Sequence, residues 1–244
     1  MADFTATLNK LKQRGYWKVE LYPSQYIESA VGRLGDCKSL ISESSVELRG
    51  WDYPHVPTLD DEKQGIYLVD GNRCESWIDW SIYKEIWRFY RSGKFTHLRG
   101  LNEHWYDEFE VLLAGNPLPN LEPRSVVDAV NSIYVLTEMF VFIYNLTNRI
   151  EGIDNFDLKI ELLNTQDNRL VVLDPARAPI HAQPNHNQSI EALRVTLSKA
   201  DTVDKDRMLQ FARQAAQNVF ENFEWQASDS LLEEMQQKLL SRRF

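Results

Sequence analysis

The stretch "EIWRFYRSGKFTHLRGL", residues 85–101, predicts the centre of this fold. Two runs rich in aromatic residues flank Ser92 and Gly93, a pattern typical of two antiparallel strands joined by a tight turn. A two-residue turn fixes a register in which Trp87 lies opposite Leu98 on the face that should join the core. We therefore expect the first half of the chain to form an antiparallel sheet.

The opposite face of this hairpin is the local basic surface that the sequence predicts. In the same register Arg88 pairs with His97, and Ile86 pairs with Arg99. Basic and aromatic side chains together suit a binder of single-stranded nucleic acid, and they are also typical of an ordinary exposed sheet face. The candidate binding residues are Arg88, Tyr90, Arg91, Lys94, Phe95, His97 and Arg99.

Alternation and periodicity predict the remaining elements. Strands are expected at 16–23, 45–51, 65–71, 74–80, 156–163, 169–173 and 190–200. Helices are expected at 3–13, 24–43, 102–113, 124–149, 204–224 and 229–241. The 124–149 helix is apolar nearly all round, so it should be buried on more than one side. The predicted fold class is α+β, with antiparallel sheets, a long buried central helix and two C-terminal helices.

A proline-rich stretch is the candidate domain boundary. "GNPLPNLEP" (115–123) holds three prolines, and six of the seven tryptophans precede residue 106. The chain is expected to divide into a Trp-rich sheet half (1–114) and a helix-rich half (123–244), or to form one continuous domain.

Composition argues against several functional classes. The net charge of −9 disfavours general nucleic-acid binding, so contact with a phosphate backbone would need a local basic patch. Two cysteines, Cys37 and Cys74, and no signal-peptide pattern are typical of a reduced, cytoplasmic protein. Asp128 and Glu138 interrupt the most apolar stretch, which argues against a membrane span.

Motifs for catalysis and cofactors are missing from the sequence. It contains no glycine-rich phosphate loop and no nucleophile elbow, so we expect no cofactor. His181 and His186 have no cysteine nearby, so we expect no metal site there. Asp157, Lys159 and Glu161 alternate on one strand face; this pattern fits either a metal-dependent nuclease or an amphipathic strand, and we favour the strand.

The stretch "LRGWDYPHVP" (48–57) gathers polar and aromatic residues at one point. Arg49, Asp52 and His55 beside Trp51 would suit a polar site. We favour a structural corner, in which a strand ends by burying Trp51 and Asp52 lies in the exit turn. A fully buried Trp51 would make its replacement by alanine cost about 3–5 kcal/mol.

The C-terminal helix supplies a candidate surface for a protein partner. Ser230 and Glu233 form a capping-box pattern at its start. Leu231, Met235 and Leu239 share one stripe along it, which is the candidate partner-binding surface.

Five segments carry a family resemblance: "RGYWKVELYP", "LRGWDYPH", "WRFYRSGKFTHLRGL", "VVLDPARAPIH" and "NFEW" with "QQKLLSRR". With them the chain resembles a group of uncharacterised bacterial proteins associated with DNA binding and with AlbA- or Schlafen-like domains. The resemblance implies a place in a bacterial multi-component system, such as antiviral defence. It carries no catalytic motif.

The expected function is a non-catalytic binding or assembly subunit with one or more protein partners. The alternatives are a nucleic-acid-binding module that uses the basic hairpin, and a metal-dependent nuclease. Self-association is compatible with the sequence, and membrane association is not expected.

Overall fold

The computed structural model describes residues 3–108, 124–174 and 177–242. Its strands are β1 (Tyr16–Pro23), β2 (Gln64–Val69), β3 (Arg73–Trp80), β4 (Tyr83–Tyr90), β5 (Phe95–Gly100), β6 (Val126–Asp128), β7 (Asn155–Leu163), β8 (Arg169–Val171) and β9 (Ser189–Ser198). Its helices are α1 (Phe4–Leu11), α2 (Leu34–Ser44), the 3-10 helix η1 (Asn102–Glu108), α3 (Ala129–Thr147), α4 (Lys199–Val203), α5 (Lys205–Glu221) and α6 (Asp229–Leu240).

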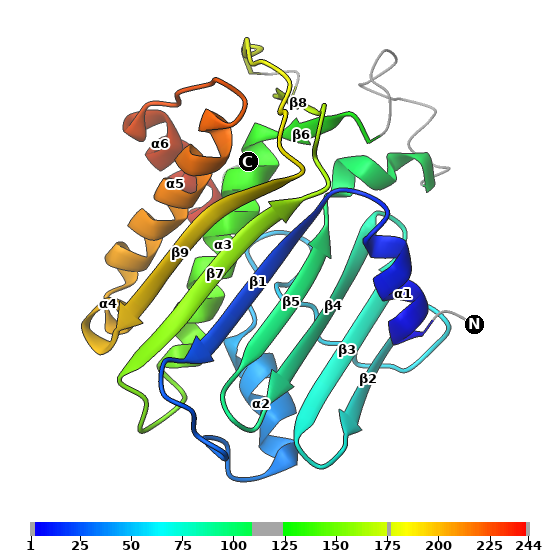
Figure 1. Cartoon of the computed structure of the whole chain (residues 1–244), viewed down its shortest axis with the longest axis vertical. Helices are drawn as coiled ribbons and strands as arrows, with labels where there is room; N and C mark the ends of the chain where they lie inside the picture. The colour runs from blue at the N-terminus through cyan, green and yellow to red at the C-terminus, as the bar shows by residue number, and fades with distance from the viewer. Residues whose placement is uncertain (1–2, 109–123, 175–176, 243–244) are drawn as a thin grey trace.

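Seven strands form one antiparallel sheet in the order β2-β3-β4-β5-β1-β7-β9, and β6 and β8 form a separate parallel pair. Helices α2, α3, α5 and α6 lie on one face of the sheet, whereas α1 lies on the other face over β3, β4 and β5 (Figure 1). The predicted α+β class is confirmed. Strand β1 pairs with both β5 and β7, so strands from before and after residues 109–123 share one sheet. The predicted boundary at 115–123 lies outside the described residues.

Helix α3 is the central helix of the covered face, as its all-round apolar sequence predicts. Its side chains Ile133, Leu136, Phe140 and Ile143 are fully buried. By length and composition α3 would suffice to cross a membrane, but 83% of its apolar window is buried inside the protein. The fold itself therefore accounts for its hydrophobicity.

The hairpin between β4 and β5 exists, but its predicted register is wrong by one residue. Trp87 pairs with His97, and Phe89 pairs with Phe95. The turn contains three residues, because the Tyr90 N–H bonds to the Lys94 carbonyl, and Gly93 takes a φ of +83° that suits glycine. One extra turn residue moves every side chain of one strand to the other face relative to its partner.

The predicted strand at 45–51 is also wrong. This segment makes a single isolated bridge, between Val46 and Tyr53, and otherwise runs as an irregular loop. Tyr53 is fully buried and is followed by a cis bond to Pro54, whereas Trp51 is only half-buried. The segment is therefore a structural corner that buries an aromatic residue, as predicted, but that residue is Tyr53 and not Trp51.

Several predicted helix boundaries change. The helix expected at 124–149 is limited to α3, because residues 126–128 form strand β6. The helix expected at 24–43 is limited to α2, because residues 24–33 form turns and bends. The one expected at 102–113 is the 3-10 helix η1 as far as Glu108, and its remainder lies outside the described residues. Helix α6 begins after Ser228, whose hydroxyl accepts the Leu231 N–H, so the predicted Ser230–Glu233 capping box is not its start.

Candidate functional site

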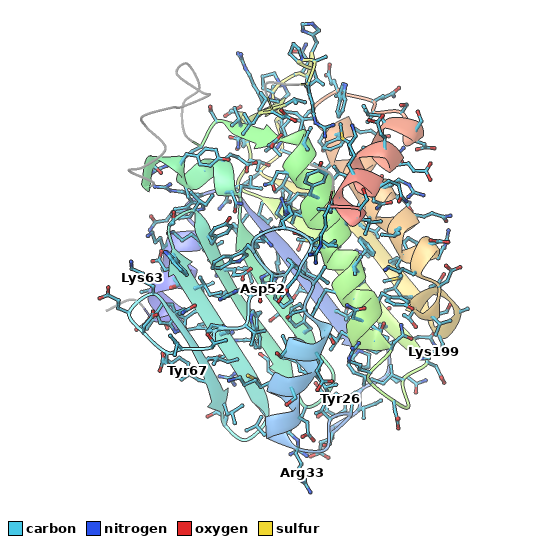
Figure 2. All side chains as sticks on the ribbon, turned by 180° about the vertical axis from the view of Figure 1, so that it is seen from behind. Tyr26, Arg33, Asp52, Lys63, Tyr67 and Lys199 are labelled. Carbon is cyan, nitrogen blue, oxygen red and sulfur yellow. The ribbon has the colours of Figure 1, made fainter. Side chains whose placement is uncertain are left out.

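Buried polar residues converge where the 45–57 loop crosses the helix-covered face over β4 and β5. Figure 2 shows Asp52 near the middle of this face. The Tyr53 hydroxyl lies 2.8 Å from Nδ1 of His97, and Nε2 of His97 lies 3.1 Å from Glu85. The other Glu85 oxygen accepts the His55 backbone N–H at 2.8 Å. The loop is thus bonded to the sheet through a continuous chain of polar groups.

The protonation states in this chain follow from burial and charge. Burial alone would raise the pKa of Glu85, but the hydrogen bond with His97 and the nearby Arg99 outweigh it and hold the pKa at about 2. Burial lowers the pKa of His97, and burial raises that of Tyr53. At neutral pH, Glu85 is therefore ionised and His97 is neutral. His97 then accepts the Tyr53 proton at Nδ1 and donates its own from Nε2.

His55 is the most exposed histidine of this corner. Its Nδ1 bonds to Asp52, and its ring stacks on Trp51 with centroids 4.2 Å apart. Burial alone would lower the pKa of His55, but the hydrogen bond and charge of Asp52 outweigh it and raise the pKa. Trp51 stacks on its other neighbour, Tyr83, at 4.1 Å. His55 and Asp52 together have the composition of an acid–base pair. However, both ring nitrogens of His55 already have partners, because Nε2 also lies 3.4 Å from Gln64.

A second set of charges joins the loop to α3. Arg49 donates to both carboxylate oxygens of Glu138, at 2.8 and 2.6 Å, and to the side chain of Asn131 at 2.7 Å. Glu138 is fully buried, so Arg49 supplies its hydrogen-bonded counter-charge. Arg99 is 4% exposed, and its Nη1 lies 3.9 Å from Glu138 without a hydrogen bond among the described residues.

Two carboxyl groups near the start of α3 have raised pKa values. Burial, together with the charge of Asp128, raises the pKa of Glu103 to about 7. Burial also raises the pKa of Asp128, which caps α3 by accepting the Val130 N–H. Glu103 accepts the Asp128 backbone N–H at 2.9 Å. Perturbed carboxyl groups are candidates for acid–base chemistry, but Glu103 is 2% exposed and its oxygens bind the protein itself.

The corner is therefore a structural network. Its strongly perturbed groups are nearly inaccessible, with exposures of 1% for Glu85, 1% for His97 and 0% for Tyr53. A substrate would have to reach atoms that the loop covers. Within the described part of the chain no group of three or more acidic, histidine or cysteine side chains is placed to hold a metal ion.

The predicted basic hairpin face does not exist as one surface. Arg88 lies on the open face of the sheet, where it pairs with Glu75 at 3.0 Å and lies over the Phe4 ring. His97 and Arg99 point to the opposite face and are buried. Phe95 is fully buried beside them, whereas Arg91 binds the carbonyl groups of Val31 and Gly32. The register error explains the difference, because side chains alternate between the faces of a strand.

The candidate nuclease residues do share one face of β7, as predicted. Lys159 lies 2.6 Å from Glu161, and Asp157 accepts the Thr196 hydroxyl at 2.6 Å. Glu161 also lies 3.5 Å from Lys18 on β1. Lys159 and Glu161 belong to a group of ion pairs across the open face, and Asp157 extends it through a hydrogen bond, which is the arrangement of an amphipathic strand.

The candidate partner stripe on α6 is unavailable to a partner. Met235 is 4% exposed and Leu239 is fully buried, and Leu231 packs partly against the same core. Helix α6 contacts α3 and α5. The apolar stripe that the sequence predicts is real, but the chain buries it in its own core.

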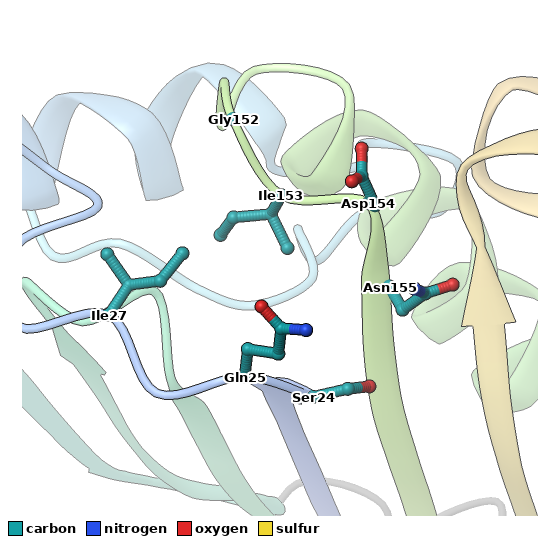
Figure 3. Close-up of a pocket in the computed structure, with 7 residues that line it drawn as sticks. All are labelled: Ser24, Gln25, Ile27, Gly152, Ile153, Asp154 and Asn155. Atoms are coloured by element: carbon teal, nitrogen blue, oxygen red, sulfur yellow. The ribbon is translucent and has the colours of Figure 1, made fainter.

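Two cavities are poor candidates for a binding or active site. One, of about 130 Å³, lies between the end of β1 and the start of β7, and it has Asp154 as its one charged lining residue (Figure 3). Another, of about 430 Å³, lies over Arg49 and Asp128. Both of these charged groups already bind other groups of the protein. Neither cavity offers a free convergent set of polar groups.

A groove of about 520 Å³ lies on the open face beside α1 and is the better candidate site. Its floor is apolar beside α1, where Leu98 and Leu163 lie, and charged farther along β1 and β7. Its wall is the face of α1 that carries Phe4 and Leu8. Tyr16 and Ile86 are nearly buried in the floor, at 8% and 3% exposure. The remaining floor and rim residues are Lys12, Lys18, Glu20, Trp87, Arg88, Thr96, Leu98, Lys159, Glu161 and Leu163.

The groove exists because the open face of β1 and of β7 is apolar at one end of the strand and charged along the rest. On the open face, β1 begins with Tyr16 and continues with Lys18 and Glu20, and β7 changes from Lys159 and Glu161 to a terminal leucine. Helix α1 covers the apolar end only in part. The alternation of 16–23 and 156–163 revealed both polar faces, but only the strand order brings them together.

No protein-family model, curated protein or solved structure matches this chain. The resemblance to bacterial DNA-binding-associated proteins therefore stays a prediction.

Proposed function

We propose that this protein is a non-catalytic binding subunit, and that the groove beside α1 holds an amphipathic segment of a partner protein. The observation that supports this is an apolar patch that lies next to charged side chains on the same sheet face, which α1 covers only in part. Partly covered apolar surface with a polar rim is typical of protein-binding sites.

The rim favours an acidic segment. The groove is lined by four basic residues, Lys12, Lys18, Arg88 and Lys159, and by two acidic ones, Glu20 and Glu161, which leaves an excess of two positive charges (four minus two). The whole chain carries −9, so this patch has the opposite sign to the protein around it. Such a local reversal of sign orients a charged partner as it approaches.

The same charges favour a protein partner over nucleic acid. Lys18 lies 2.7 Å from Glu20, Lys159 pairs with Glu161 and Arg88 pairs with Glu75. Affinity for a phosphate backbone comes from cations that neutralise phosphates and release counterions. Cations that already pair with carboxylates release few counterions, which weakens binding to a phosphate backbone. An amphipathic peptide would gain most of its affinity from its apolar residues, so the small excess of positive charge needs only to favour acidic over basic peptides. A cytoplasmic location, expected from the cysteine content, completes the proposal, together with a role in a bacterial multi-component system that the resemblance alone implies.

Peptide selection tests the proposal directly, because it does not require the partner to be identified first. Peptides of 15 residues, drawn from an amphipathic library, are selected against the full chain, and their Kd is measured by fluorescence anisotropy. We expect acidic amphipathic peptides whose Kd rises at least tenfold with Leu98→Glu or Leu8→Glu. Val203→Glu is the matched control, because Val203 is an exposed apolar residue outside the groove.

Two outcomes would contradict the proposal. The first is a set of selected peptides that bind the groove variants as tightly as the native chain. The second is cleavage of DNA or RNA by the purified protein with Mg²⁺ or Mn²⁺ that Asp157→Asn abolishes, which would show a nuclease.

A further inference from the structure

Strand β2 is one edge of the sheet, and its free side offers hydrogen-bonding groups. The Asp79 N–H donates to the Lys63 carbonyl at 2.7 Å, which places Lys63 at a hydrogen-bonded position of the ladder with β3. Hydrogen-bonded positions alternate along an antiparallel pair. Tyr67 therefore directs its backbone toward β3, and Ile66 and Leu68 direct their N–H and C=O groups outward.

From Ile66 to Val69 this edge lacks the features that usually protect an edge strand, whereas at Gln64 the outward N–H and C=O already bond to Asp61. Its sequence, QGIYLV, contains no charge and no proline. The opposite edge strand, β9, carries Glu191 and Arg194, and the side chain of Asn218 binds the carbonyl of Ala192. Exposed edges are ordinarily blocked by charge, proline or a covering element.

Exposed apolar side chains concentrate near the same edge. Leu68 is 54% exposed, Tyr67 41%, Trp80 48% and Leu59 68%. Tyr67 lies on the outer edge of the sheet, on the strand that begins next to Lys63 (Figure 2). These are four of the seven exposed large hydrophobic residues among the described parts of the chain, so this side of the molecule holds most of them.

We propose that β2 pairs with β2 of a second copy of this chain, antiparallel, about a two-fold axis that passes by Tyr67. In this register Ile66 of each copy lies opposite Leu68 of the other. Both residues have outward backbone groups, so the two pairs exchange about four hydrogen bonds. The two sheets then continue into one sheet across the interface.

A second copy fits this edge because the edge is self-complementary. Ile66 and Leu68 flank Tyr67 symmetrically and share one face, so a two-fold rotation matches apolar with apolar and donor with acceptor. The acidic run Asp60, Asp61 and Glu62 precedes β2. Antiparallel pairing places these runs at opposite ends of the interface, whereas parallel pairing would place them side by side.

Analytical ultracentrifugation of the full chain tests this proposal. We expect the native chain to dimerise at micromolar concentration, and Leu68→Pro to be monomeric. The Leu68 N–H points outward, so proline there removes a bond to the second copy and leaves the ladder with β3 intact. Val203→Lys, at an exposed residue of α4, is the control and should stay dimeric.

Amide hydrogen exchange gives an independent measurement if Leu68→Pro fails to fold. The Ile66 and Leu68 amides should exchange at least tenfold more slowly at high protein concentration than at low concentration.

Added salt should strengthen this dimer, because both copies carry a net charge of −9, whereas it should weaken acidic peptide binding in the groove. A native chain that stays monomeric up to about 100 µM, or a dimer in which these amides gain no protection, would overturn the proposal.

Discussion

The Tyr53 hydroxyl lies 2.8 Å from Nδ1 of His97, although the two residues are 44 positions apart in the sequence. Tyr53 also packs edge-on against Phe142 of α3. One side chain of an irregular loop thus contacts the middle of the sheet and the central helix at once. The loop covers this face where a helix would otherwise be needed. Several of its polar groups bond to side chains of the sheet instead of to solvent.

Tyr53 should contribute more stability than Trp51. Tyr53→Phe leaves His97 without its donor at Nδ1 in a buried position, which should cost about 1–3 kcal/mol. Trp51→Ala should cost less than the 3–5 kcal/mol of a fully buried aromatic residue, because Trp51 is half-buried. Urea unfolding of Tyr53→Phe, Tyr53→Ala and Trp51→Ala measures these costs, and Tyr53→Ala should be less stable than Trp51→Ala. A Trp51→Ala variant less stable than Tyr53→Ala would contradict it.

Glu85 should make the protein more stable at neutral than at acid pH. Its folded pKa of about 2 lies below the ordinary value of 4.5, so its contribution is complete above pH 4.5 and is lost as the pH falls toward 2. The shift corresponds to about 3 kcal/mol. Glu85→Gln should therefore be destabilised by that order at pH 7, and the difference should shrink toward pH 3. Denaturant unfolding across this range measures it, and a pH-independent difference would exclude the charge as its cause.

Glu103 should have the opposite effect. Its folded pKa of about 7 lies above 4.5, so the folded state holds a proton that the unfolded state has lost between these values. Stability should fall as the pH rises from 4.5 to 7. Glu103→Gln removes this penalty, so its Tm should exceed that of the native chain at pH 8 and approach it at pH 5. A native chain whose Tm rises relative to the variant over this range would contradict the raised pKa.

The sequence predicted the elements of this fold better than their relationships. The strand at 16–23 and the buried helix α3 follow from local periodicity, and both are confirmed. The hairpin register depended on whether the turn has two residues or three, and "RSGK" is compatible with both. That single ambiguity moved Arg88 away from His97 and removed the predicted basic surface.

The site could be predicted only in part, for a related reason. Arg49, Asp52 and His55 stand out in the sequence as a polar cluster, and they do form one region of bonded groups. Their partners Glu85 and Glu138 lie far along the chain, and periodicity gives no signal that two carboxylates at apolar positions meet a loop. The prediction for α6 fails for the same reason. An apolar stripe on a helix does not reveal whether it packs against the rest of its own chain or against another protein.

The Arg49–Glu138 pair should show strong coupling in a double-mutant cycle. Arg49→Met leaves the buried Glu138 carboxylate without its hydrogen-bonded counter-charge, so we expect a loss of about 3–5 kcal/mol in the free energy of unfolding. Arg49→Met combined with Glu138→Gln should lose less than the sum of the two single variants, because no unpaired carboxylate remains. Arg207→Met is the matched control: Arg207 pairs with Asp201 on the surface, so its loss should cost about 1 kcal/mol or less. Additive effects of the Arg49 and Glu138 replacements would show that this pair does not fasten the loop to α3.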